Sequence, residues 1–335
     1  MTIAEAQKLK NNGIAIIPLF PNQKKNHDTD ILTKEYEVSE VKADDNLGVN
    51  LKQSNMYCID PDTGYAIRFA EMWLPRDTRI NGRIHQGKKE LTKFFYESDG
   101  SLKQNIKDRK DSSGETICEL FCDHNIVVYG STPNKQTGLP MKRYWESESS
   151  LKPFNQSVLD TFNLICLAAA VAPHLKSANT GCLKLDSCLM RYTDWSDEKR
   201  EQVLLDICKV AMPDNKEATP QKMRRIIRAN NREIKNAGYN SFADYIGVDR
   251  TLVRTWFGWI GEVPEDKSKY TKSFRDFLNK GIDMKALMTE EIPPMRWAVQ
   301  PILPEGLVIL AGVPKAMKSW TCLLLAYAIE NGFDF

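Results

Sequence analysis

Long apolar runs are missing from this sequence of 335 residues. No segment approaches the roughly 20 consecutive apolar residues of a membrane-spanning helix. The N-terminus also lacks the apolar core of a signal peptide. We therefore expect a cytoplasmic protein with no membrane partner.

A disulfide framework and a strong charge of one sign are also lacking. The eight cysteines are scattered among apolar neighbours, which is typical of reduced core residues. The formal net charge is only +2. It neither supports nor excludes a nucleic-acid partner, because binding needs a local basic face. Basic clusters occur at 103–110 and 222–232, although most such runs are solvated helix faces.

The stretch 55–77, NMYCIDPDTGYAIRFAEMWLPRD, runs from an apolar strand into a helix. Asp60 and Asp62 follow the predicted strand 56–59, and residues two apart in a strand point to the same side. Paired carboxylates of this kind bind Mg²⁺ or Mn²⁺ in phosphoryl transfer. A surface turn is the alternative, because Asp, Pro and Gly are common turn residues.

The first 150 residues read as strands with few helices. Periodicity predicts helices at 3–12 and 65–73, and strands at 14–18, 47–51, 56–59, 116–121, 127–130 and 143–145. The short polar turn between 47–51 and 56–59 predicts that these two strands pair as a hairpin.

Three further charged residues in this region are candidates for the same site. Arg83 and Lys93 could grip phosphate oxygens, Arg through a bidentate fork and Lys as a point charge. Each could equally be a surface cation. Glu119 stands in an apolar strand, so we expect it to be paired, metal-bound or turned to solvent.

From about residue 151 the pattern changes from strands to helices. Apolar residues recur at helical spacing in 156–172, 182–192, 198–211, 221–236 and 241–259. This predicts an all-α domain over 151–264, with the apolar stripes as its core. A charged connector, 265–295, follows it and ends in Pro293-Pro294.

The last segment, 296–335, reads as the start of a phosphate-binding unit. A buried strand at 306–311 leads into GVPKAMKS and then an apolar helix. In this layout backbone N–H groups from Gly312 to Lys315 cradle phosphates, Lys318 reaches the β and γ groups, and Ser319 meets Mg²⁺. Met317 replaces the second glycine of the pattern, so a degenerate loop is the alternative. The sequence ends one helix into a fold that needs several more strands.

The first 150 residues resemble the bifunctional primase-polymerase domain of the archaeo-eukaryotic primase superfamily, found in replication proteins of phages and plasmids. The resemblance rests on AEAQKLKNNGIAIIPLFPNQKK, NLGVNL, CIDPDTG, NGR with TKFFY, CELF and VVYGSTPNKQTGLPMKRYWE. Residues 155–262 look like the helical domain that follows such primases. The end, PPMRWAVQPILPEGLVILAGVPKAMKSW, is similar to the start of a RepA-like or hexameric helicase ATPase.

The resemblance implies Asp60, Asp62 and Glu119 as ligands of Mg²⁺ or Mn²⁺. It implies Lys93 and Ser131 on the phosphate side of the nucleotide, with Lys93 where the family carries a histidine. A lysine keeps its charge at neutral pH and does not reproduce a neutral imidazole. The histidine expected after Ser131 is also missing.

The fold expected from all this is an α+β primase-polymerase domain with a mainly antiparallel sheet and flanking helices. An all-α domain and the start of an α/β P-loop NTPase follow it. The implied activity is template-directed synthesis on single-stranded DNA with a primer and dNTP or NTP, in a bacterial cell or phage-infected host. ATP would bind the P-loop of the full-length protein, which could be a hexamer.

Two other readings remain open. In the first, the chain is a replication-initiation or helicase-loading protein that binds DNA or nucleotide without catalysis, because of the altered histidine position. In the second, it is a P-loop ATPase whose N-terminal part is an adaptor.

Overall fold

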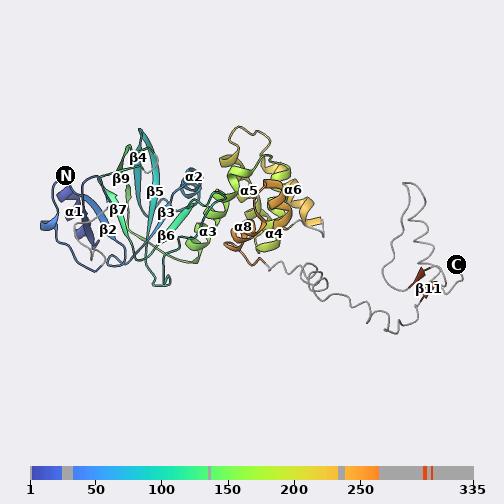
Figure 1. Cartoon of the computed structure of the whole chain (residues 1–335), viewed down its shortest axis with the longest axis horizontal. Coiled ribbons are helices and arrows are strands. Elements are labelled where there is room, and N and C mark those ends of the chain that lie inside the picture. Colours follow the sequence, from blue (N-terminus) through green and yellow to red (C-terminus); the bar gives the residue numbers. More distant parts are fainter. Residues whose placement is uncertain are drawn as a thin grey trace, which may run out of the picture. The chain divides into compact units, whose positions relative to one another are not determined.

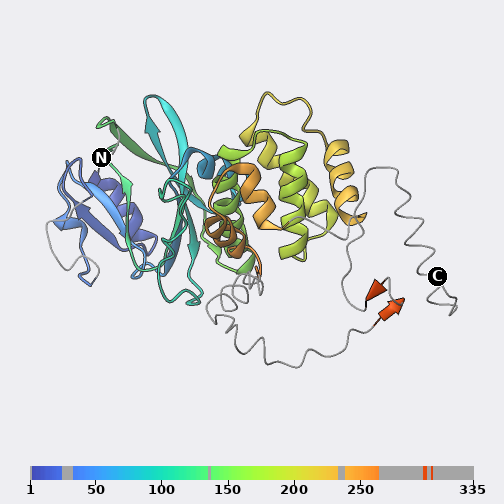
Figure 2. The same cartoon turned by 45° about the vertical axis from the view of Figure 1, so that its right-hand side comes forward.

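The computed structural model describes residues 2–24, 33–134, 137–232 and 238–263, and the backbone of two short strands near the C-terminus. The chain divides into two units, residues 1–264 and 265–335. In the first unit the layers follow one another from helix α1 through two sheets to a group of helices (Figures 1 and 2). The α+β class and the mainly antiparallel sheet expected from the sequence are confirmed.

The smaller sheet lies next to helix α1 (Thr2–Asn11). Its strands are antiparallel in the order β1 (Ile16–Leu19), β2 (Asn46–Asn50) and β7 (Asn125–Tyr129). The 3-10 helix η1 (Val38–Glu40) precedes β2. Nearly every residue of these strands is buried, because the sheet packs against α1 on one side and the larger sheet on the other.

The larger sheet has seven strands, ordered β6-β3-β5-β4-β9-β8, with β10 pairing in parallel with β5. All its other pairs are antiparallel. The strands are β3 (Met56–Pro61), β4 (Arg79–His85), β5 (Lys88–Glu97), β6 (Cys118–Phe121), β8 (Ser131–Pro133), β9 (Pro140–Glu148) and β10 (Lys152–Pro153).

The predicted hairpin between 47–51 and 56–59 is wrong. Both strands form, but β2 pairs with β1 and β7 in one sheet, whereas β3 pairs with β5 and β6 in the other. Asn55, with a φ of 52°, lies in the turn between them, where the chain leaves the first sheet. The turn therefore connects two sheets instead of closing a hairpin.

The two faces of β3 belong to different cores, as strand alternation requires. Tyr57 and Ile59 pack with α2 (Gly64–Trp73) and α3 (Gln156–Val171) in the larger core. Met56 and Cys58 face the smaller sheet. Because Asp60 follows Cys58 by two residues, its side chain also lies on the face toward the smaller sheet.

The remaining helices are α4 (Thr180–Tyr192), α5 (Asp197–Ala211), α6 (Pro220–Arg232), α7 (Tyr239–Ile246) and α8 (Arg250–Gly258). The single helix predicted over 241–259 is in fact α7 and α8. Gly247 takes the left-handed conformation at φ 71° and ends α7. Asp249 then caps α8 by accepting hydrogen bonds from the backbone of Thr251 and Leu252.

The sheet region and the helices share one hydrophobic core. Trp73 Nε1 donates to Asp206 Oδ2 on α5 at 3.0 Å, and Trp256 Nε1 on α8 donates to the Lys110 carbonyl at 3.0 Å. The helix Gln156–His174, which is α3 with the 3-10 helix η2 (Ala172–His174), is long and apolar enough to cross a membrane by length and composition. Its most apolar window is 61% buried in this core, as in a helix that packs inside a folded domain.

In the second unit the structure describes two short strands, β11 (Trp297–Val299) and β12 (Leu303–Pro304), which pair antiparallel. The predicted P-loop residues Gly312, Lys315, Lys318 and Ser319 lie outside the described residues. So does the connector predicted at 265–295.

Candidate functional site

A row of charged side chains crosses the larger sheet on the face toward the smaller one. Asp60 on β3 lies opposite Glu119 on β6 in the strand register. On its other side, the Lys93 ammonium of β5 forms an ion pair with Asp60 Oδ2. Lys93 is only 4% exposed. The structure thus brings Asp60, Glu119 and Lys93 together across three adjacent strands.

Asp62 lies just beyond β3, where the chain turns into α2. Its backbone N–H donates to the Ile117 carbonyl, and Thr63 then caps α2 through a hydrogen bond from the backbone N–H of Ala66. These bonds fix the backbone at Asp62, two residues after Asp60. Asp62 is exposed to solvent, whereas Asp60 is half-buried.

The three carboxylates influence one another. Desolvation by the surrounding protein, together with the negative charges of Asp60 and Glu119, raises the pKa of Asp62 to about 7. Lys93 and Lys24 act in the opposite direction. Lys24, in the turn after β1, was not singled out from the sequence as a site residue. Its positive charge nevertheless acts to lower the pKa of Asp62.

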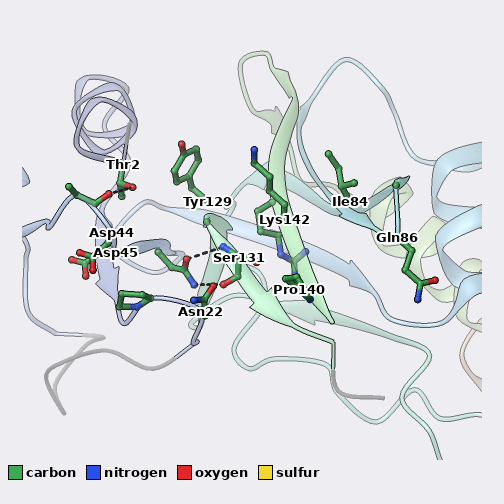
Figure 3. Close-up of a pocket in the computed structure, with 16 residues that line it drawn as sticks. Thr2, Asn22, Asp44, Asp45, Ile84, Gln86, Tyr129, Ser131, Pro140 and Lys142 are labelled. Atoms are coloured by element: carbon green, nitrogen blue, oxygen red, sulfur yellow. Dashed lines mark hydrogen bonds between the residues drawn. The ribbon is translucent and has the colours of Figure 1, made fainter. Parts of the chain in front are cut away.

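A pocket of about 690 Å³ lies between the smaller sheet and the β8–β9 end of the larger one, and neither Lys93 nor the three carboxylates line it. Thr2, Asp44 and Asp45 lie on one side, and Ser131 and Lys142 on the other (Figure 3). Ser131, predicted on the phosphate side, therefore lines a pocket.

The wall at Ser131 is fixed by Asn46 on the neighbouring sheet. Asn46 accepts a hydrogen bond from the Ser131 N–H at 3.0 Å and donates to the Ser131 carbonyl at 2.7 Å. Gly130 makes this approach possible. It has a φ of 98°, and a Cβ there would lie 1.9 Å from Asn46 Oδ1.

Arg143 on β9 was missed from the sequence, although it lines the pocket and is only 5% exposed. Its Nη1 donates to Thr92 Oγ1 at 3.1 Å, while its Nε is buried without a hydrogen-bond partner. Burial lowers the pKa of this guanidinium, and the charge of Asp60 partly opposes that shift. The sequence signal that could have identified Arg143 is a cation at an inward-facing position of a strand.

Arg83 lies on β4 next to this group but already has a partner. Its Nε is 2.7 Å from Glu90 Oε2, directly across from it on β5. Of the two arginines, only Arg143 lacks an ion pair among the residues the structure describes.

The donor chemistry of the carboxylates suits a hard divalent cation, because all three supply oxygen. Among the described residues, no group of three or more His, Cys, Asp or Glu side chains converges closely enough to hold a metal ion. Oδ2 of Asp60 is already ion-paired with Lys93.

Comparison with known proteins adds no relative from which a function could be transferred. No family model matches the sequence, and no curated protein matches it significantly. The function must therefore be argued from the site itself.

Proposed function

We propose that the chain is a DNA primase-polymerase of a mobile-element replication protein. The reaction is template-directed nucleotidyl transfer to a 3′-hydroxyl. The observation that carries this proposal is the alignment of Asp60 with Glu119 across β3 and β6, with Asp62 alongside and Lys93 on the opposite flank. Carboxylates beside buried cations suit a substrate that combines divalent cations with phosphates.

Asp60, Asp62 and Glu119 are the residues that would hold Mg²⁺ or Mn²⁺. Their oxygen donors fit such ions. Desolvation and, after it, the neighbouring negative charges raise the pKa of Asp62, and both would be relieved by a bound cation. When bound, two such ions lower the pKa of the attacking hydroxyl and stabilise the leaving pyrophosphate.

The cations of the site have a separate role. Arg143 offers a buried guanidinium to the pocket, and Lys93 is a second buried cation two strands away. Both can neutralise a triphosphate. Arg83 is a weaker candidate than the sequence suggested, because Glu90 already neutralises it. Ser131 and its neighbours would orient the nucleotide from the pocket wall.

The test is primer extension and de novo synthesis by the whole chain on single-stranded DNA with Mn²⁺ or Mg²⁺. We expect metal-dependent product from the wild type and none from the Asp60→Ala, Asp62→Ala double variant. Asp108→Ala is the matched control, because its side chain is 76% exposed and, within the described part of the chain, is paired with Arg109 alone. Product from the double variant would refute the proposal.

One observation favours the non-catalytic alternative, a replication-initiation or helicase-loading module. Lys93 stands where the resembled family has a histidine, and its ammonium is ion-paired with Asp60. Under this alternative, well-folded wild-type protein binds single-stranded DNA but makes no product with either metal. ATP binding and hexamer formation through residues 296–335 stay predictions, with Lys318→Ala as the variant that tests ATP binding.

A further inference from the structure

Lys93 lies at an irregular point of the sheet. Asn81 on β4 pairs with Lys93, whereas the next residue, Gly82, pairs with Leu91. Thr92 is therefore the extra residue of a β-bulge, a feature that re-aims side chains next to functional sites. The bulge places two hydrogen-bonding side chains in succession, with Thr92 bound to Arg143 and Lys93 bound to Asp60.

The two cations beside the bulge, Arg143 and Lys93, differ in how firmly they are held. The Arg143 guanidinium is planar and is fixed to the Thr92 hydroxyl. Lys93 carries its ammonium on a flexible four-carbon stem with three rotatable donors. Of the two, Lys93 can change partners without moving a strand.

Asp60 is the carboxylate for which two cations compete. A divalent ion held by Asp60, Asp62 and Glu119 would lie beside the ammonium of Lys93, and like charges so close repel each other. A neutral imidazole at position 93 would not compete in this way. The ion pair and the divalent ion therefore compete for Asp60.

We propose that Lys93 is the resident counter-ion of Asp60, that a divalent cation displaces it, and that the released ammonium then becomes a ligand for phosphate. This inference rests on the proposed function, because it takes Asp60 as a metal ligand. In the metal-free protein Lys93 neutralises the carboxylate cluster. After exchange the same charge is available to the polyphosphate, so metal and nucleotide bind cooperatively.

The first test is the Mn²⁺ affinity of the whole chain, measured by electron paramagnetic resonance of the free ion. We expect Lys93→Met to bind Mn²⁺ more tightly than the wild type by about tenfold or more, within the usual range of coupling between two sites. Lys93→His should also bind more tightly at neutral pH. Arg83→Met is the matched control, since it removes a half-buried cation that has its own partner, Glu90.

The second test uses the wild type, so it does not depend on the folding of a variant. An amine-reactive label followed by mass spectrometry should leave Lys93 unmodified without metal, because it is 4% exposed and ion-paired. With Mn²⁺ present, labelling of Lys93 should rise several-fold relative to the exposed Lys52.

The outcomes separate this inference from the proposed function. Equal Mn²⁺ affinity in the wild type and Lys93→Met, or no change in Lys93 labelling when Mn²⁺ binds, overturns the exchange and leaves the metal site standing. Absence of Mn²⁺ binding in both proteins overturns the exchange and the metal-dependent function together.

Discussion

Arg143 and Thr92 are joined by a single hydrogen bond of 3.1 Å, from Nη1 of the guanidinium to Oγ1 of the hydroxyl. Among the described residues this neutral hydroxyl is the one hydrogen-bond partner of a guanidinium that is 5% exposed. A buried cation without a counter-charge is unfavourable for the folded state. Asp60 is the largest source of negative charge acting on this guanidinium and offsets only part of the effect of burial on its pKa.

Replacing Arg143 should affect binding and stability in opposite directions. We expect Arg143→Met to weaken tripolyphosphate binding by about 1.5–3 kcal/mol, the range for a hydrogen bond to a charged group. Its thermal stability should stay equal or rise. Calorimetric titration and thermal unfolding measure the two effects, with the exposed Arg250→Met on α8 as the control. Loss of stability without loss of binding would show that Arg143 is structural.

The carboxylate cluster predicts a pH dependence of stability. The pKa of Asp62 is about 7 in the folded chain against an ordinary value of 3.8, so between these values the folded state holds a proton that the unfolded state has lost. Stability is therefore greatest below the lower value and falls as pH rises through the higher one.

Urea unfolding at a series of pH values tests this. Asp62→Asn should remove the part of the slope that lies between pH 3.8 and about 7. Saturating Mg²⁺ should reduce the slope in the wild type, because a bound cation stabilises the charged carboxylates. An unchanged slope in Asp62→Asn would contradict the assignment.

The close approach at Gly130 predicts a costly substitution. Gly130→Ala combines a φ of 98° with a Cβ 1.9 Å from Asn46 Oδ1. Gly138→Ala has a similar φ of 69° and nothing within 4 Å. We expect about 1–3 kcal/mol of destabilisation from backbone strain at either site, and a further loss at Gly130 alone. Equal denaturation midpoints for the two variants would refute the contact argument.

The helical region contains a buried ion pair that should be sensitive to truncation of one partner. Arg200 Nη1 lies 2.7 Å from Asp186 Oδ1, with side chains 3% and 0% exposed. Arg200→Met leaves an uncompensated buried carboxylate, which typically costs about 3–5 kcal/mol. Arg250→Met is the control, because its pair with Asp244 is 60% and 59% exposed and such pairs contribute about 0–1 kcal/mol. Chemical denaturation gives both values.

Local patterns predicted the elements better than their pairing. The strand at Met56–Pro61 and the helix after Thr63 are encoded in a few neighbouring residues, and the alternation that aligns Asp60 with Cys58 follows from the strand itself. The wrong hairpin between β2 and β3 arose because pairing is decided by distant partners such as β7. No local signal in the sequence specifies those contacts.

The same limit applied to the site. Asp60, Asp62 and Glu119 carried a recognisable pattern, and the structure pairs Asp60 with Glu119 across β3 and β6, with Asp62 two residues further along the chain. The pairing of Arg83 with Glu90 depends on a register that a bulge shifts, so it could not be read from spacing. The position of Arg143 in the pocket wall depends on the packing of two sheets against each other. The only trace of that packing in the sequence is an alternating pattern along the strand.

The corner at Gly130 has a consequence for how this molecule can evolve. The chain leaves the smaller sheet at Tyr129 and enters the larger one at Ser131, so a single residue joins two walls of the pocket. On this side the width of the pocket is set by backbone atoms, so replacing one side chain does not change it. Exposed lining residues such as Lys142 and Gln86 remain free to vary. Substitutions at such residues can therefore change which ligand charge the pocket prefers, while the width of the pocket at Gly130 stays the same.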